Sequence, residues 1–220
     1  KLVETGYRVT IVEQRGYPLS RLENFDVLSF NIEELSKDIE ELIIKLKLDQ
    51  NLTIVGHDWG SIVAWAIISR EKINISKLIS ICGGTEFPTT AVYKNLTYKE
   101  KPHYISSFQN FKASADIIDN NLESFFRSAY RKNDLIGEAT DLSLDNVFIN
   151  YSSESCVMNE NEIVNLIQHF DAFSLDQAIA WYSNIDLNTK LSSAWRKVVT
   201  TPVHFIFGEV DAAVKLNDKM

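Results

Sequence analysis

Residues 52–68 read "LTIVGHDWGSIVAWAII" and place an acid on a sharp turn. Leu52 to Val55 form a continuous apolar run, which is typical of a strand buried on both faces. The residues after Gly60 are apolar on most sides of a predicted helix. Gly56 and Gly60 flank Asp58 with the spacing of a nucleophile elbow, and we expect both glycines to remove side chains that would clash in the bend. The stretch therefore predicts an α/β fold with a carboxylate between a strand and a helix.

The segments on either side of this stretch extend the alternation of strands and helices. Short apolar runs at Tyr7–Val12, Leu78–Cys82 and Val203–Phe207 predict further strands. Asn31 followed by Glu34 has the spacing of a capping box, and apolar residues then recur at helical spacing. Buried strands that alternate with helices indicate a parallel sheet with crossover helices.

The alternation stops between roughly Phe87 and Trp195, where the sequence has helical patterns of its own. We therefore predict a helical cap at residues 87–196, inserted between two parts of one core at residues 1–86 and 197–220. A cap in this place lies over the carboxyl ends of the strands, where open α/β sheets bind ligands. The helical patterns comprise Leu122, Phe125, Phe126 and Ala129 on one face, and the capping-box pairs Asn159 with Glu162 and Ser174 with Gln177.

The composition favours a globular domain that binds a neutral small molecule. The chain has 220 residues, of which 45% are apolar and 24% charged, so it has enough core formers for one domain with an insertion. A net charge of -8 disfavours nucleic acid and anionic membrane surfaces as partners. Cys82 and Cys156 have no metal-ligand spacing, which predicts two buried thiols in a reducing, cytoplasmic compartment. We expect no metal, no cofactor and no membrane span.

The acid at the elbow changes the chemistry that a serine would perform there. A carboxylate is a poor acyl acceptor, but it displaces a leaving group from a saturated carbon and becomes an alkyl ester. Water then attacks the Asp58 carbonyl, a step that needs a histidine base, an orienting acid and a backbone donor such as the Trp59 N–H. The competing interpretation makes Asp58 an ordinary helix N-cap. His57 is expected to face away from the site. Ser61 lies one glycine past the bend, so we expect a first-turn helix residue there rather than a nucleophile.

Four blocks of sequence carry a family resemblance: "GYRVTIVEQRGY", "LTIVGHDWGSIVAW", "AWYSN" and "TPVHFIFGEVD". In this order they resemble the epoxide hydrolase branch of the α/β-hydrolase family, and GHDWG is the most specific of the matching motifs. The resemblance implies an α/β-hydrolase fold with a helical cap inserted between strands. It also implies that Asp58 is the nucleophile, that Asp211 orients the base, and that Tyr182 and Tyr104 hydrogen-bond and protonate the epoxide oxygen. The implied partners are a small apolar epoxide and water.

Two parts of the family's machinery are not found in this sequence. The family's histidine follows the position of Asp211, and its His-Gly-x-Pro oxyanion segment precedes the first matching block. We therefore expect a fragment that lacks both ends of a longer enzyme and that forms an alkyl ester without turning over. Two alternatives stay open: a haloalkane dehalogenase, which shares Asp58 and Trp59, and an inactive fragment that only binds apolar ligands. The sequence does not indicate the substrate's identity or the oligomeric state.

Overall fold

The computed structural model describes residues 1–48, 51–84, 90, 94–95, 97–98, 100–131, 142–149, 156–195 and 198–208. Its main sheet holds three parallel strands in the order β1-β2-β5. These are β1 (Thr53–His57), β2 (Lys77–Ile81) and β5 (Val203–Ile206). They confirm three of the apolar runs that were predicted as strands, and they confirm the parallel sheet.

The two helices that flank β1 in the sequence pack together beside the sheet. Helix α1 (Ile32–Leu46) contacts α2 (Trp59–Arg70), which in turn packs on β1 and β2. The Asn31 side chain accepts hydrogen bonds from the backbone N–H groups of Glu33 and Glu34, as its spacing predicts. The Glu34 carboxylate instead pairs with Lys37 at 2.7 Å, so only half of the predicted capping box forms.

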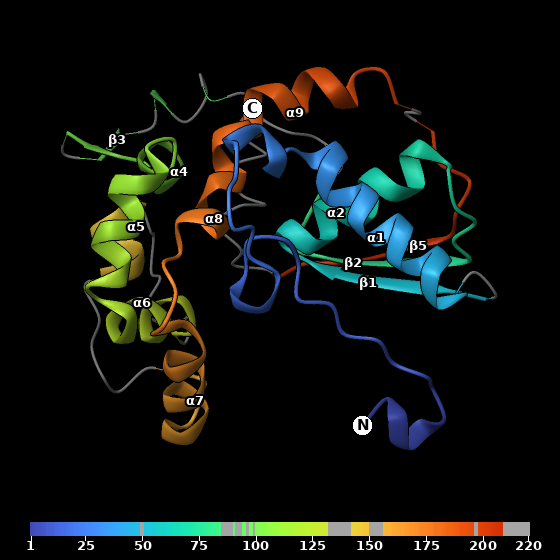
Figure 1. Cartoon of the computed structure of the whole chain (residues 1–220), viewed down its shortest axis with the longest axis horizontal. Coiled ribbons are helices and arrows are strands. Elements are labelled where there is room, and N and C mark those ends of the chain that lie inside the picture. Colours follow the sequence, from blue (N-terminus) through green and yellow to red (C-terminus); the bar gives the residue numbers. More distant parts are fainter. Residues whose placement is uncertain are drawn as a thin grey trace.

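The predicted strand at Tyr7–Val12 is wrong. This segment forms no strand, and its side chains are exposed, with 90% of the surface of Ile11 accessible. A strand exists only where a neighbour completes its hydrogen-bond ladder, and among the described residues β1 pairs with β2 alone. Figure 1 shows this segment as an open trace that leads from the N-terminus to the body of the molecule. The apolar pattern predicted the residue types of a strand correctly, but it does not specify a partner.

The chain between β2 and β5 is mainly helical in the described ranges, as predicted. Figure 1 shows α4 to α7 gathered in one group, with α8 between this group and the sheet, and α9 on the same side of the sheet as α1 and α2. The elements here are β3 (Thr97–Tyr98), β4 (Lys101–Pro102), α4 (Tyr104–Ser107), α5 (Phe111–Asp119), α6 (Leu122–Ala129), the π-helical turn η5 (Asp145–Ile149), α7 (Glu160–Phe170), α8 (Asp176–Ile179), the 3-10 helix η7 (Ala180–Asn184) and α9 (Ile185–Ser192). Before α1, short 3-10 helices cover Val3–Thr5 (η1), Pro18–Ser20 (η2) and Val27–Phe30 (η3).

The two capping-box predictions in this segment have different outcomes. Asn159 and Glu162 form the complete reciprocal box at the start of α7. Ser174 and Gln177 do not, because the Gln177 carboxamide bonds both backbone groups of Leu22 at 2.8 and 2.9 Å. Spacing predicts a cap only when no tertiary partner competes for the side chain.

Two groups of buried apolar side chains form the interior. The sheet cluster surrounds α1, α2 and β2, and the helical cluster lies among α5 to α8. Tyr17 and Phe111 pack against both clusters, so the two are in contact. The sheet cluster consists of Phe30, Ile32, Leu35, Ile43, Val63, Ala64, Ala66, Ile67, Ile68, Ile75, Leu78, Ala180 and Trp181, and the helical cluster of Phe108, Ala115, Ile118, Leu122, Phe126, Leu144, Ile163, Phe170, Leu175 and Ile179.

Two further findings concern the expected thiols and the expected lack of a membrane span. Neither Cys82 nor Cys156 forms a disulfide, and both side chains are partly rather than fully buried. Within the described ranges, no helix has both the length and the apolar character needed to cross a membrane.

Candidate active site

Asp58 occupies a strained turn between β1 and α2. Its φ of 51° and ψ of -122° are values that a residue with a side chain rarely adopts. Bonds from the surrounding backbone hold it there: the Asp58 N–H donates to the Ile81 carbonyl at 3.0 Å, and the Ser61 N–H donates to the Asp58 carbonyl at 2.9 Å. Asp58 stands at the N-cap position of α2, but its carboxylate makes no capping bond to that helix, so it does not act as an ordinary N-cap.

The carboxylate lies where the fold favours a charged group. The Asp58 side chain is exposed and stands at the amino-terminal end of α2, where the helix dipole is positive. Trp59 is the first residue of that helix, so its backbone N–H points from the same positive end. His57 ends β1 and is also exposed.

Of the two elbow glycines, only Gly56 lies where there is no room for a Cβ atom. A Cβ atom on Gly56 would lie 2.4 Å from the Gly60 carbonyl oxygen and 2.6 Å from the Ser61 Cα, and neither backbone atom can move freely. A Cβ on Gly60 would meet only the Gln14 side chain, at 3.6 Å. The expectation that both glycines relieve a clash is therefore correct for Gly56 and wrong for Gly60.

A third glycine, Gly83, follows the neighbouring strand β2 and completes the support of the elbow. A Cβ on Gly83 would lie 2.7 Å from the Asp58 carbonyl oxygen. Beneath the turn, the Ser61 and Ser80 hydroxyls are 2.6 Å apart, Ser80 donates to the Gly83 carbonyl at 2.7 Å, and the Trp65 indole donates to Ser80 at 2.9 Å. Ser61 is fully buried in this network, which agrees with the prediction that it is not the nucleophile.

The structure brings the two predicted tyrosines together from separate elements. Tyr104 begins α4, and Tyr182 lies in η7, and their ring centroids are 6.4 Å apart. The Phe108 ring contacts both, at 5.5 Å from Tyr104 and 4.8 Å from Tyr182. The tyrosine pair is thus part of the described structure, while its catalytic role stays a prediction.

Trp59 connects the tyrosine pair to the elbow. Its ring meets the Tyr182 ring edge-on at 5.2 Å, and its side chain also hydrogen-bonds the Tyr182 phenol. Burial raises the pKa of Tyr182 well above 10, and the charges of Tyr104 and Asp58 raise it further, while the bond with Trp59 acts in the opposite direction. The phenol therefore stays protonated at neutral pH and keeps its hydrogen for donation.

Sequence reasoning missed a third phenol near Asp58. Tyr17 packs edge-on against Trp181 at 5.9 Å and Phe170 at 6.2 Å. Burial raises its pKa to about 12, and the Asp58 charge adds to the effect. Tyr17 follows Gly16 in the block "GYRVTIVEQRGY", but no spacing rule distinguishes a site tyrosine there from a packing one.

Asp211 lies outside the described residues, so its predicted role in orienting a base stays a prediction. Among the residues that the structure describes, no group of three or more His, Cys, Asp or Glu side chains could hold a metal ion.

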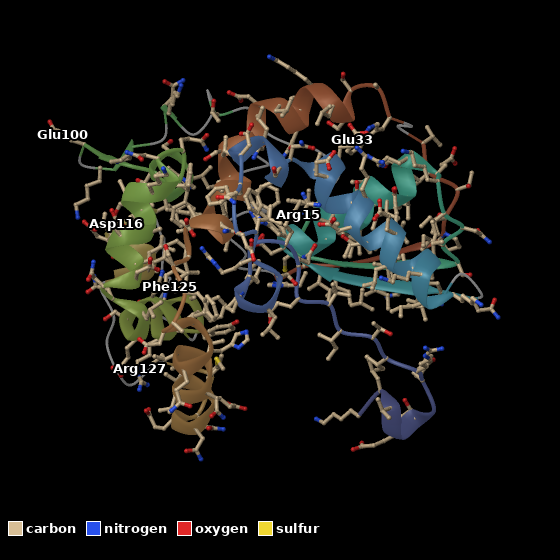
Figure 2. All side chains as sticks on the ribbon, viewed as in Figure 1. Arg15, Glu33, Glu100, Asp116, Phe125 and Arg127 are labelled. Carbon is tan, nitrogen blue, oxygen red and sulfur yellow. The ribbon has the colours of Figure 1, made fainter. Side chains whose placement is uncertain are left out.

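A cavity of about 340 Å³ lies between residues 12–22 and α1, and none of the predicted site residues lines it. The guanidinium of Arg15 pairs with the Asp38 carboxylate on its wall. Figure 2 shows Arg15 at the centre of the molecule, between the sheet with its helices and the helical group on the other side. The cavity contains no predicted nucleophile, and the tyrosine pair remains the better candidate site.

His103 packs against Tyr104, and we expect its burial to make the stability of the fold depend on pH. The two rings stack with centroids 4.7 Å apart, and burial lowers the pKa of His103 from 6.5 to about 4. Between these values the unfolded chain binds a proton that the folded chain does not, so stability is present above pH 6.5 and is lost as the pH falls toward 4. Urea unfolding should show a loss of up to about 1.4 kcal/mol per pH unit in this window.

The matched variants are His103→Asn and His57→Asn. Asparagine at position 103 keeps an acceptor for the Ile105 N–H, which His103 Nδ1 now bonds, and it removes the titrating ring. We expect a smaller acid loss for His103→Asn, and the wild-type loss for His57→Asn because His57 is exposed. An acid loss in His103→Asn as large as in the wild type would contradict the assignment.

Comparison with known proteins agrees with this fold. The family model described as the alpha/beta hydrolase fold matches residues 1–219. The chain belongs to the α/β-hydrolase fold family.

The curated relatives cover part of the chain. The AB hydrolase superfamily protein YfhM of Bacillus subtilis is 38% identical over 107 residues, which are 48% of this chain and 35% of that protein. Epoxide hydrolase 1 of Caenorhabditis elegans is 33% identical over 109 residues, which are 48% of this chain and 26% of that protein. The matched part thus spans about a third or less of the length of these relatives.

Solved structures resemble almost the whole chain. An epoxide hydrolase from an endophytic Streptomyces superposes with a TM-score of 0.77 at 18% identity, covering 94% of this chain and 66% of that one. Epoxide hydrolase VrEH1 from Vigna radiata superposes with a TM-score of 0.71 at 21% identity, with the same coverage of 94% and 66%. At these identities the likeness establishes the fold.

Proposed function

We propose that this chain performs the nucleophilic first step of the epoxide hydrolase reaction. The complete reaction opens an epoxide to a vicinal diol. One observation carries the proposal: the Tyr104 and Tyr182 rings lie together, and Tyr182 packs against Trp59, which follows Asp58 at the elbow. An epoxide oxygen leaves as an alkoxide that needs a proton, and neutral phenols supply one. The epoxide hydrolase names of several relatives support the same reaction class.

In the first step, a carboxylate oxygen of Asp58 attacks one ring carbon of the epoxide. The carbon–oxygen bond breaks, its electron pair passes to the ring oxygen, and that oxygen takes a proton from Tyr104 or Tyr182. The products are an alkyl ester on Asp58, a neighbouring hydroxyl group and a tyrosinate, which regains its proton when water later hydrolyses the ester to the Asp58 carboxylate and the diol. The raised pKa of Tyr182 keeps its donor hydrogen in place at neutral pH.

In the second step, water attacks the Asp58 ester carbonyl and releases the diol. The backbone N–H of Trp59 would stabilise the oxyanion, and Asp211 would orient a histidine that activates the water. The family's histidine follows the position of Asp211, and no histidine follows it in these 220 residues. The alkyl ester on Asp58 is the intermediate between the two steps, and its formation makes the first step directly observable.

The helical segment at residues 87–196 is proposed to act as a cap over the elbow. It supplies both Tyr104 and Tyr182, while the core supplies Asp58 and Trp59. A small apolar epoxide held between cap and core would meet the nucleophile on one side and the phenols on the other. Two further parts of the proposal rest on the sequence alone. They are the division into a core at residues 1–86 and 197–220, and a cytoplasmic localisation.

A haloalkane dehalogenase is the main competing function, because it shares the Asp58 nucleophile and the following tryptophan. A halide leaves without a proton and needs N–H donors around it. The Trp59 side chain bonds the Tyr182 phenol instead, which favours a leaving oxygen over a leaving halide.

Single-turnover mass spectrometry separates the candidates. The protein is incubated with an excess of styrene oxide or, in parallel, of 1-bromobutane, and its intact mass is followed over time. The proposal predicts a mass gain equal to one epoxide and no gain with the bromoalkane. A butyl adduct would favour the dehalogenase, and a lack of adduct with either reagent would favour a ligand-binding fragment.

A further inference from the structure

The two phenols stand on segments that have little intrinsic rigidity. Helix α4, which begins at Tyr104, has only four residues, and η7, which holds Tyr182, is a 3-10 helix of five residues. Helices this short are unstable by themselves, and 3-10 hydrogen bonds have poorer geometry than α-helical ones. The spacing of the phenols therefore depends on tertiary contacts, and those between the two segments are among them.

One side chain makes that connection with both of its donor hydrogens. The Gln109 carboxamide nitrogen donates to the Ile105 carbonyl at 3.1 Å and to the Tyr182 carbonyl at 2.9 Å. Ile105 is the residue after Tyr104, so a single amide group bonds the backbone beside one tyrosine and the backbone of the other. The Ser183 hydroxyl donates a longer hydrogen bond of 3.4 Å to the backbone carbonyl of Gln109.

We propose that Gln109 is a positioning residue, whose carboxamide fixes the distance between the Tyr104 and Tyr182 phenols and so their joint access to one substrate oxygen. Two donors on one nitrogen are needed, because the two acceptors are both carbonyl oxygens. Glutamate would set a negative oxygen against them, and methionine, of similar length, has no donor. The proposal rests on the proposed function, since it is the epoxide oxygen that both phenols are to reach.

Gln177 provides the matched control. It too bridges separate segments through its carboxamide, with bonds to both backbone groups of Leu22, and it is 2% exposed. Neither of its bonds involves a residue of the tyrosine pair. Gln109→Met and Gln177→Met thus remove equivalent amide groups, and both are expected to lower the melting temperature.

The first readout is the rate of ester formation on Asp58 with styrene oxide. A misplacement of reacting groups by about 1 Å can cost about a hundredfold in rate, so we expect Gln109→Met to slow adduct formation by roughly tenfold to a hundredfold. Gln177→Met should keep the wild-type rate. Equal rates for wild type and Gln109→Met, or an equal slowing in both variants, would overturn the proposal.

The second readout requires no epoxide, so it separates failure of this inference from failure of the proposed function. The protein is labelled with 3-fluorotyrosine, and the fluorine resonances of Tyr104 and Tyr182 are assigned by Tyr→Phe substitutions. Because the two rings are in contact, Tyr104→Phe should shift the Tyr182 resonance in the wild type and in Gln177→Met. In Gln109→Met this cross-effect should be lost, and its full retention would overturn the proposal.

The two readouts remain decisive in unfavourable cases. If the wild type forms no adduct with any epoxide, the proposed function fails, while the fluorine measurement still decides the role of Gln109. If Gln109→Met shows no cooperative thermal transition, Gln109→Asn replaces it. Asparagine keeps both donors but is one methylene shorter, so it cannot bond both carbonyls, and the same loss of the cross-effect is expected.

Discussion

Alanine at Gly56 should prevent the elbow from forming and lower the free energy of unfolding by about 3 kcal/mol or more. The added Cβ would stand 2.4 Å from the Gly60 carbonyl oxygen and 2.6 Å from the Ser61 Cα, which are backbone atoms of the first turn of α2. Relief of the clash would require β1 and α2 to separate, although β1 is hydrogen-bonded to β2 along its length. Urea unfolding followed by circular dichroism measures the loss.

Gly60→Ala is the control, because a Cβ there would meet only the Gln14 side chain at 3.6 Å. Alanine favours a helix over glycine by up to about 1 kcal/mol, so this variant should be as stable as the wild type or slightly more so. Equal stabilities for Gly56→Ala and Gly60→Ala would show that β1 and α2 do not meet at the distance described.

Replacing Tyr182 with phenylalanine should slow ester formation on Asp58 by roughly a hundredfold or more, since a positioned proton donor contributes about 10²–10⁴ in rate. The ring stays in place against Trp59, and the substitution removes the donor to the leaving oxygen together with the hydroxyl that the Trp59 side chain bonds. Tyr104→Phe should have an effect of the same kind, and the double variant should form almost no ester. Intact-mass time courses with styrene oxide provide the rates.

The control for these variants is Tyr7→Phe, because Tyr7 is 66% exposed and is not part of the tyrosine pair. It should form the ester at the wild-type rate. Wild-type rates in both Tyr104→Phe and Tyr182→Phe would contradict the role of the phenols and would favour a leaving group that needs no proton.

Sequence patterns correctly predicted the features that are formed by residues only a few positions apart. The Asn31 cap, the Asn159 capping box and the bend at Asp58 depend on near neighbours in the chain, and all three are present. The parallel sheet was also predictable, because continuous apolar runs separated by helices have few other arrangements.

The sequence could not predict features that depend on distant partners. Tyr7–Val12 has the composition of a strand but no neighbour among the described residues, and Gln177 bonds Leu22 instead of capping its own helix. Tyr17 and Gln109 belong to the site only because the chain folds them toward Trp181 and Tyr182. Residue types and spacing do not indicate such contacts. The family resemblance, in contrast, did indicate Tyr104 and Tyr182.

The most direct test of the central claim locates the ester. Protein modified with styrene oxide is digested, and the peptide that contains residues 52–68 is fragmented in the mass spectrometer. If the Asp58 carboxylate is the nucleophile, one epoxide mass will be found on Asp58, and Asp58→Asn will remain unmodified under the same conditions. An adduct on another residue, or an adduct that persists in Asp58→Asn, would contradict the account.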